Sequence, residues 1–251
     1  MTEQRCVLLL HAYAPPLTDE DRRPLVIVEA MEHGMPGLRL GWTISDQGEF
    51  IAAPEGSARN VQRTRDGGFA LYCNGNNDSL IIVSGWESPA NLCPGRQAQL
   101  VVYAKWPADS ATNEAASDVL ERVSVGALSY WAELTPDSAA LEIDGQSLPG
   151  PRGAPNPRRG LPVLKRPEEL RSSVIPSYLG WLNYWSPATA QAIGFPDPKR
   201  DAELLARSRR TEAGGWVVRL TDAPLDLDNP AHLQALLRAY ERFPRIGGRA
   251  P

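Results

Sequence analysis

The sequence is poor in cysteine, and the spacing of its cysteines suits neither a metal site nor a disulfide framework. The three cysteines are Cys6, Cys73 and Cys93. None forms a CxxC or CxxH pair, and an odd number leaves at least one thiol unpaired. We therefore expect buried free thiols in a reducing compartment rather than the disulfides of a secreted protein.

Long apolar runs are also missing. No stretch approaches the roughly 18 apolar residues that a membrane-spanning helix needs. The first residues, MTEQRCVLLLHAYAPP, lack both the basic segment and the apolar length of a secretory signal. These absences predict a cytoplasmic protein that makes no contact with a membrane.

The common motifs of nucleotide binding, nucleophilic catalysis and metal binding are absent as well. The chain has no phosphate loop of the GxxxxGKS or GxxxxGKT type, no strand-linked GxGxxG and no GxSxG elbow. His11, His33 and His232 are scattered, and although Glu29 lies one helical turn before His33, no third ligand follows at a metal-binding spacing. Cys73, in YCNGNND, is interpreted as a strand end that enters an Asn-Gly turn rather than as a nucleophile. We expect no catalytic residue, no metal and no other cofactor.

What the sequence does contain indicates a well-packed core and an uneven charge. The chain has 251 residues, 42% of them hydrophobic, and seven tryptophans, so it needs no disulfide or metal to fold. Residues 1–150 contain 10 Lys/Arg and 20 Asp/Glu, a net charge of −10, whereas residues 151–251 contain 16 and 10, a net charge of +6. An acidic half can attract a basic partner. A solvated acidic surface is the simpler interpretation.

Hydrophobic periodicity in residues 1–144 predicts a mostly antiparallel sheet with helices packed on one face. The predicted strands cover residues 6–13, 38–44, 49–52, 68–73, 80–86 and 97–106. One helix is predicted over 18–33, with Pro24 in its first turn. A second is predicted over 113–134, where apolar residues recur at steps of three and four.

Proline and glycine divide the rest of the chain. They supply 10 of the 23 residues from 145 to 167, which predicts a linker with no helix or central strand over 147–159. Residues 168–251 then form a smaller α/β lobe. Its predicted elements are strands over 178–185 and 216–221, short helices after Ser186 and Asp197, and a closing helix from Pro230. The chain is thus predicted to be α+β, either as two lobes joined by this linker or as one continuous domain.

Three aromatic and amide side chains lie on one face of the predicted strand 178–185. They are Trp181, Asn183 and Trp185, because side chains alternate along a strand. Large aromatic residues in a strand favour a buried core, and a buried amide can satisfy backbone groups. An aromatic shelf for a small ligand is the alternative interpretation.

A short basic run consists of Arg207, Arg209 and Arg210. Basic runs can contact nucleic acid. This one lies between the carboxylates at positions 203 and 212 and is typical of a solvated helix end. We therefore expect no direct contact with nucleic acid.

An acidic stripe is the surface feature that best suits a binding role. Glu114, Asp118 and Glu121 are spaced four and three residues apart, so they line the face of the predicted helix opposite its apolar stripe. Like charges in this arrangement mildly destabilise an isolated helix, and a partner that supplies Arg and Lys would relieve the repulsion. These three residues are the predicted partner-binding residues. A plain solvated face is the alternative.

Several segments resemble a bacterial family of unknown function associated with the immunity protein 52 group. The similar segments are GWLNYWS, AIGFPDP, GGWVVRLTDAP and LDLDNPAHL in the C-terminal part, and GLRLGWTIS, GGFALYCNGN and IIVSGWE in the N-terminal part. Members of that group are antidotes of polymorphic toxin systems, and several accompany nuclease toxins. The resemblance implies an immunity protein and supplies no catalytic positions.

The sequence therefore predicts a non-enzymatic cytoplasmic protein that binds and occludes a cognate toxin, which the resemblance suggests is a nuclease. Nucleases carry basic surfaces that bind phosphates, so an acidic inhibitor surface is electrostatically suitable. An enzyme with its site in a cleft between the lobes, involving Cys73 or His11, is the alternative. A small-ligand binder that uses Trp181 and Trp185 is the third possibility.

Overall fold

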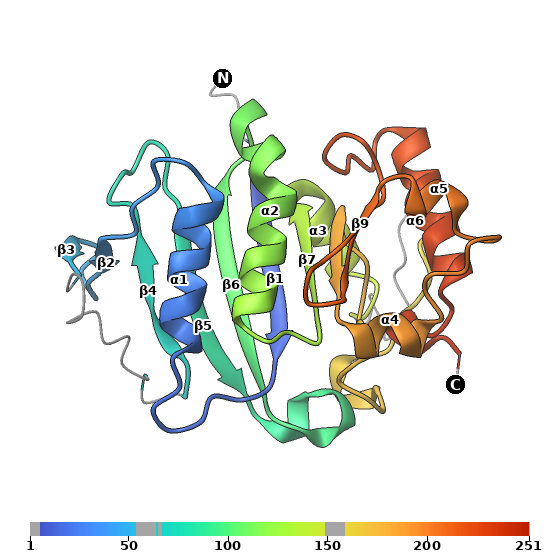
Figure 1. Cartoon of the computed structure of the whole chain (residues 1–251), viewed down its shortest axis with the longest axis horizontal. Helices are drawn as coiled ribbons and strands as arrows, with labels where there is room; N and C mark the ends of the chain where they lie inside the picture. Colours follow the sequence, from blue (N-terminus) through green and yellow to red (C-terminus); the bar gives the residue numbers. More distant parts are fainter. Residues whose placement is uncertain (1–5, 54–63, 65–66, 149–158, 251) are drawn as a thin grey trace.

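The computed structural model describes residues 6–53, 64, 67–148 and 159–250, and these residues form one ten-stranded sheet with helices packed against it (Figure 1). The strand order is β3-β2-β4-β5-β6-β1-β7-β8-β10-β9. Each strand pairing is antiparallel. The predicted α+β class with a mostly antiparallel sheet is confirmed. The strands are β1 Val7–Ala14, β2 Trp42–Ile44, β3 Phe50–Ala52, β4 Phe69–Cys73, β5 Ile82–Ser88, β6 Gln99–Pro107, β7 Trp131–Pro136, β8 Leu182–Trp185, β9 Ser208–Arg210 and β10 Trp216–Arg219.

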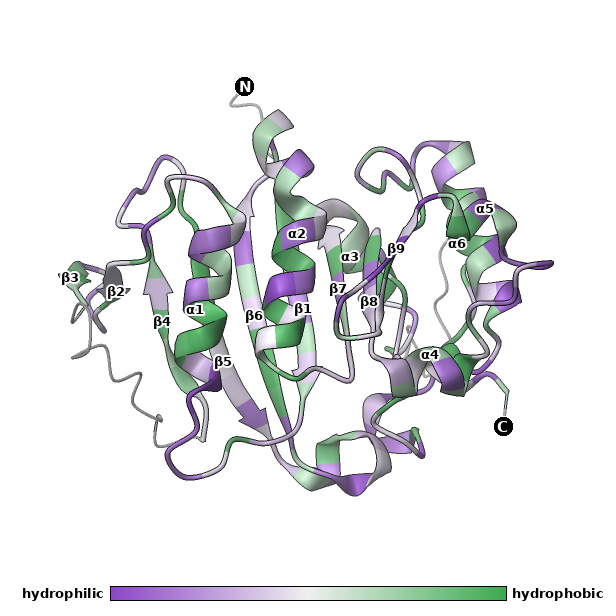
Figure 2. Cartoon of the chain, in the orientation of Figure 1, coloured by the Kyte–Doolittle hydropathy of each residue, from purple (hydrophilic) through white to green (hydrophobic). Residues whose placement is uncertain are grey.

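Two helices lie side by side over one face of the central strands (Figure 1). They pack closely, since a Cβ on Gly34 of α1 would lie only 2.8 Å from Val119 of α2. Hydrophobic and hydrophilic residues alternate along both helices, as expected when one face is buried and the other exposed (Figure 2). No helix in the described part of the chain has the length and apolar character to cross a membrane. The helices are α1 Arg23–Gly34, α2 Ser110–Gly126, α3 Asp137–Asp144, α4 Pro187–Ile193, α5 Ala202–Leu205 and α6 Pro230–Arg242.

Residues 6–13 are nearly continuously apolar, which predicts a central strand covered on both faces, and β1 is indeed a central strand. It lies between β6 and β7, and every second residue is fully buried on the face beneath α1 and α2. The buried residues of this face are Leu8, Leu10, Ala12 and Ala14. The residues between them, including His11 and Tyr13, point to the opposite face and are partly exposed.

The prediction of a helix over 113–134 is wrong for its last eight residues. Helix α2 ends at Gly126, Leu128 adopts a left-handed φ of 57°, and the chain reverses into β7. The error has a physical origin. All six residues of β7 are buried, so apolar residues continue to appear at helical spacing after the helix has ended. Trp131 and Leu134 therefore belong to a central strand and not to the stripe of α2.

Other predicted elements differ from the structure at their ends. The predicted strand 38–44 is regular only in β2, and Trp42 is 40% exposed, although Leu40 is buried before it. The helix predicted after Asp197 begins at Ala202, because the Asp197 carboxylate accepts hydrogen bonds from two backbone amides of the turn that follows it. The thiol of Cys6 is exposed, whereas those of Cys73 and Cys93 are buried as expected.

The sheet continues from the N-terminal to the C-terminal part of the chain. Strand β8 pairs with β7, with Asn183 opposite Glu133 and Leu182 opposite Leu134. Backbone hydrogen bonds of one sheet thus join the segments on either side of residues 145–167. Most of the segment predicted to lack regular structure, residues 149–158, lies outside the described residues.

The C-terminal helices begin where their sequences indicate. Ser186 caps α4 by accepting a hydrogen bond from the Thr189 amide at 3.2 Å, and Asn229 caps α6 in the same way from the Ala231 amide at 2.9 Å. Beneath these helices Trp185 makes edge-to-face contacts with Phe195 and Phe243, at centroid distances of 5.0 and 5.1 Å. This aromatic cluster is the core of the C-terminal part.

Candidate functional site

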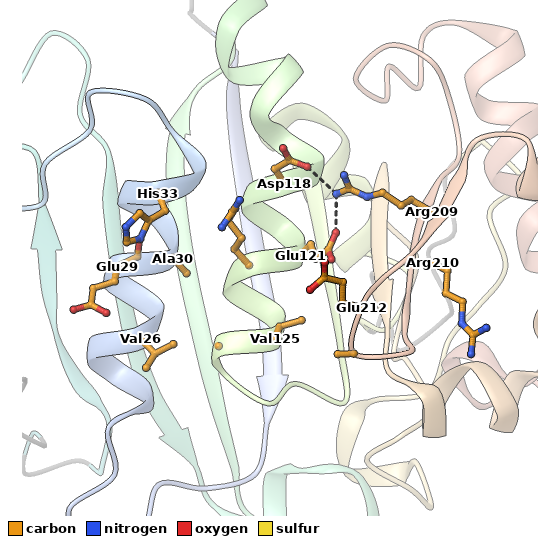
Figure 3. Close-up of a pocket in the computed structure, with 13 residues that line it drawn as sticks. Val26, Glu29, Ala30, His33, Asp118, Glu121, Val125, Arg209, Arg210 and Glu212 are labelled. Atoms are coloured by element: carbon orange, nitrogen blue, oxygen red, sulfur yellow. Dashed lines mark hydrogen bonds and ion pairs between the residues drawn. The ribbon is translucent and has the colours of Figure 1, made fainter.

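A groove runs between α1, α2 and the segment that carries β9 (Figure 3). Its volume is about 640 Å³, and charged side chains from all three elements line it. The charged and polar residues of the lining are Glu29, His33, Asp118, Glu121, Arg122, Arg209, Arg210 and Glu212. Two valines with partly exposed side chains, Val26 (41%) and Val125 (36%), provide apolar contact area in the same groove.

Two carboxylates of the predicted acidic stripe bind one arginine in this groove. The Nη2 atom of Arg209 lies 2.8 Å from the Asp118 carboxylate and 2.7 Å from that of Glu121 (Figure 3). The side chains of Arg209 and Asp118 are 50% and 54% exposed, whereas that of Glu121 is 22% exposed. Exposed ion pairs contribute about 0–1 kcal/mol because water competes for both partners. The ion pairs between Arg209 and these two carboxylates are therefore weak, and another cation could replace Arg209.

Glu114, the third residue of the stripe, lies apart from this contact. It is exposed on α2, does not line the groove, and makes no ion pair within the described part of the chain. The structure thus brings Asp118 and Glu121 together around Arg209 and leaves Glu114 about one helical turn away. Sequence reasoning missed Arg209 as a partner, because 91 residues separate it from Asp118.

The three arginines of the basic run line two different pockets. Arg209 and Arg210 belong to strand β9, so the interpretation of the whole run as a helix end is wrong. Arg207 precedes that strand and lines a second pocket beside α5 and α6. Arg209 and Arg210 both line the groove, and of the two Arg209 reaches the carboxylates of α2.

A histidine–carboxylate pair lies on the sheet face opposite α1 and α2. His11 of β1 and Glu133 of β7 are directly opposite in register, and Nδ1 of His11 donates to Oε1 of Glu133 at 2.8 Å. The His11 side chain is 22% exposed, whereas that of Glu133 is 3% exposed. The second carboxylate oxygen, Oε2, accepts no hydrogen bond from the described residues. Sequence reasoning missed this pair because it placed Glu133 in a helix.

The surroundings of His11 favour its charged form. Burial lowers the pKa of His11, but the hydrogen bond and the negative charge of Glu133, together with the charge of Asp144, outweigh burial and leave the pKa raised. Tyr103, on the neighbouring strand β6, packs against the imidazole at a centroid distance of 5.3 Å. Protonated His11 therefore interacts with Glu133 as an ion pair.

This arrangement predicts that His11 stabilises the fold more in acid than in base. A raised pKa contributes stability that is fully present below the unfolded value, about 6.5, and is lost as the pH rises through the folded value. The loss of unfolding free energy caused by His11→Gln should be larger at pH 5.5 than at pH 8.5 in urea titrations. The difference should become smaller when Glu133→Gln is the background, because Asp144 is then the remaining carboxylate that raises the His11 pKa. An equal loss at both pH values would contradict the assignment.

The remaining reactive side chains do not assemble into a site. Cys73 is fully buried in β4 and forms no hydrogen bond to a histidine among the described residues. Nδ1 of His33 donates to the backbone carbonyl of Glu29 at 2.8 Å, and Nδ1 of His232 accepts from the Asp226 amide at 3.1 Å. No group of three histidine, cysteine or acidic residues in the described ranges could hold a metal ion.

The aromatic face of β8 is core and not a ligand shelf. Trp181, Asn183 and Trp185 are each no more than 1% exposed. The Asn183 amide donates to the carbonyl of Gly180 and accepts from its N–H, both at 3.0 Å. Nε1 of Trp181 donates to the carbonyl of Thr221 at 2.9 Å. The predicted role of Asn183 in satisfying backbone groups is confirmed.

Comparisons with known proteins identify relatives of unknown function and a shared fold. The sequence matches the model of a domain of unknown function, DUF5953, over residues 19–251. No curated protein matches it. Among solved structures, a protein described as Pseudomonas aeruginosa T6SS protein PA0821 is similar, with a TM-score of 0.56 and 11% sequence identity. That similarity covers 95% of this chain and 76% of the other, and at such low identity it shows the fold alone. Because the family model covers almost the whole sequence, the chain belongs to the DUF5953 family.

Proposed function

We propose that this protein is a non-enzymatic immunity protein that binds a cognate toxin of the nuclease class in the cytoplasm and blocks its active surface. The observation that carries the proposal is the carboxylate pair Asp118–Glu121, which holds an exposed guanidinium in an open groove. A basic side chain of a partner would meet the same two carboxylates. A nuclease must present such side chains to bind phosphates.

Further observations support this proposal. The resemblance of several segments to the immunity protein 52 group implies an antidote, and the fold shared with a T6SS protein is compatible with a secretion-related or immunity role. The net charge of −10 over residues 1–150 would steer a basic partner toward the half that carries α1 and α2. Val26 and Val125 would add apolar contact beside the charged pairs.

Co-expression with the product of the neighbouring gene tests the proposal directly. If that gene encodes a nuclease toxin, the two proteins should co-purify as a stable complex, and cells should survive toxin expression only when this protein is present. The purified complex should show no nuclease activity. A neighbouring gene for unrelated metabolism, together with no binding to any adjacent gene product, would overturn the proposal.

Replacement of the acidic stripe should separate binding from stability. In the triple variant Glu114→Gln, Asp118→Gln and Glu121→Gln, the unfolding free energy should fall by about 1 kcal/mol or less, because exposed charges contribute little. Association with the toxin should become slower and less dependent on salt, because charges at the rim of an interface act mainly on encounter. Stopped-flow association at two salt concentrations and urea unfolding measure the two effects.

Arg209→Gln is the matched variant, and it should change the association rate in the opposite direction. It leaves Asp118 and Glu121 without their internal cation and should therefore accelerate association with a basic toxin at low salt. The single variant Glu114→Gln then shows whether the interface extends beyond the groove. Unchanged association rates in both the triple variant and Arg209→Gln would remove α2 from the interface.

The enzyme alternative rests on a different observation, the contact between His11 and the buried carboxylate of Glu133. Such pairs serve as general bases in many enzymes. His11→Gln distinguishes the two possibilities. As an immunity protein, the variant should retain full protection against the toxin at neutral pH, whereas an enzyme that uses His11 would lose its activity.

A further inference from the structure

The C-terminal part of the chain contains a concave pocket with an excess of positive charge. It lies beside α5 and α6 and has a volume of about 360 Å³. Its basic residues are Lys199, Arg200, Arg207, Arg238 and Arg242. The one acidic residue that lines it is Glu203, which is exposed and forms no ion pair in the described part of the chain. This pocket is part of the reason that residues 151–251 carry a net charge of +6.

One of the five basic residues is neutralised inside the protein, and the other four are not. Arg242 donates through Nε and Nη2 to the Asp201 carboxylate at 2.5 and 2.9 Å, and the Asp201 side chain is fully buried. Lys199, Arg200 and Arg238 form no ion pair with a described carboxylate. Arg207 forms none either, and its Nε is enclosed without a hydrogen-bond acceptor. Bringing several unpaired cations together is unfavourable unless an anion joins them.

The floor of the pocket differs chemically from its rim. Leu204 is partly exposed and offers apolar contact area, whereas Leu220 and Ala239 also line the pocket but are at most 3% exposed. A pocket of this volume fits a small ligand, since ligand pockets usually span about 300–1,000 Å³. A nucleic acid instead requires several phosphate contacts along an extended surface. The combination suits a compact molecule with a multiply charged end and a less polar body.

We infer that this pocket binds a small phosphorylated molecule, with its phosphate groups held by Arg207 and Arg238 and its uncharged part against Leu204. Phosphate suits the site because arginine binds phosphate oxygens through two parallel hydrogen bonds. The ion pair between Arg242 and Asp201 fixes α6 against the start of α5 and so holds the two sides of the pocket in place. This binding site is separate from the carboxylate pair on α2 and does not depend on the proposed immunity function.

Calorimetric titration of the full chain at low salt tests the inference, with inorganic pyrophosphate, ADP and adenosine as the probes. Pyrophosphate and ADP should bind with saturation, ADP the more tightly because its uncharged part contacts the apolar floor, and adenosine should not bind. Arg207→Gln and Arg238→Gln should each weaken binding by about tenfold or more, the usual effect of losing a charge-assisted hydrogen bond. Arg210→Gln, an exposed arginine of β9 outside the pocket, should leave the affinity unchanged.

Three results would overturn the inference. One is the absence of saturable binding of both pyrophosphate and ADP. Another is equal affinity of the wild type and the Arg238→Gln variant for ADP and pyrophosphate. Arg238 is exposed on α6, so this substitution should not unfold the protein. The last is binding of a single-stranded oligonucleotide without binding of either small probe, which would make the surface a nucleic-acid contact instead.

Discussion

Val123→Asp should unfold the protein at room temperature. Val123 lies on the face of α2 that covers the sheet, is fully buried and belongs to the hydrophobic core. An unpaired buried charge costs several kcal/mol. Folded domains are stable by only about 5–15 kcal/mol in total, so one such charge removes most of the margin. Circular dichroism and urea titration would show loss of the cooperative transition.

Val125→Asp, two residues further along α2, provides the matched control. Its side chain is 36% exposed and lines the groove, so the new carboxylate remains hydrated and should change the unfolding free energy by less than about 1 kcal/mol. The two variants carry the same substitution on opposite faces of one helix. Equal destabilisation by both would mean that the two faces of α2 are assigned incorrectly.

Trp185→Ala should cost about 3–5 kcal/mol of unfolding free energy, the usual effect of removing a large buried aromatic side chain. Trp185 is fully buried, and its removal would leave Phe195 and Phe243 facing a cavity. Trp185 belongs to the single sheet that joins the N-terminal and C-terminal parts of the chain. The substitution should therefore lower the temperature of one unfolding transition and not produce two transitions. Differential scanning calorimetry distinguishes these outcomes.

Trp86→Ala is the control, because it removes an indole ring that is exposed and not buried. Trp86 is 42% exposed, and the aromatic contact that it makes, with Tyr103, is loose at 6.5 Å. We expect a loss of less than about 1 kcal/mol, well below that of Trp185→Ala. A loss from Trp86→Ala as large as that from Trp185→Ala would indicate that the exposed indole packs against something further.

Local chemistry determined which elements could be predicted from the sequence. Ser186 and Asn229 cap their helices as predicted, because a cap depends only on the next two or three residues. The central position of β1 likewise follows from its own apolar sequence. The end of α2 was predicted incorrectly because burial on both faces of β7 hides the change from helical to strand periodicity.

The two polar contacts of the candidate sites could not be predicted from the sequence, because each joins distant segments. Arg209 reaches Asp118 across 91 residues of sequence, and His11 reaches Glu133 across 122. The first depends on where the β9 segment lies against α2, and the second on the register between β1 and β7. Neither position follows from local periodicity. The acidic stripe itself was visible because one helix carries all three residues.

The pairing of β7 with β8 has a consequence for the order in which the protein is made. About 45 residues separate the end of β7 from the start of β8, and at roughly 5–20 residues per second the ribosome needs several seconds to add them. During that interval β7, buried on all six residues in the finished protein, is the open edge of an incomplete sheet. An open apolar edge invites pairing with other chains. Nascent chains that stall before Leu182 should therefore require a chaperone or aggregate, while in the completed protein the edges of the described sheet are the short strands β3 and β9.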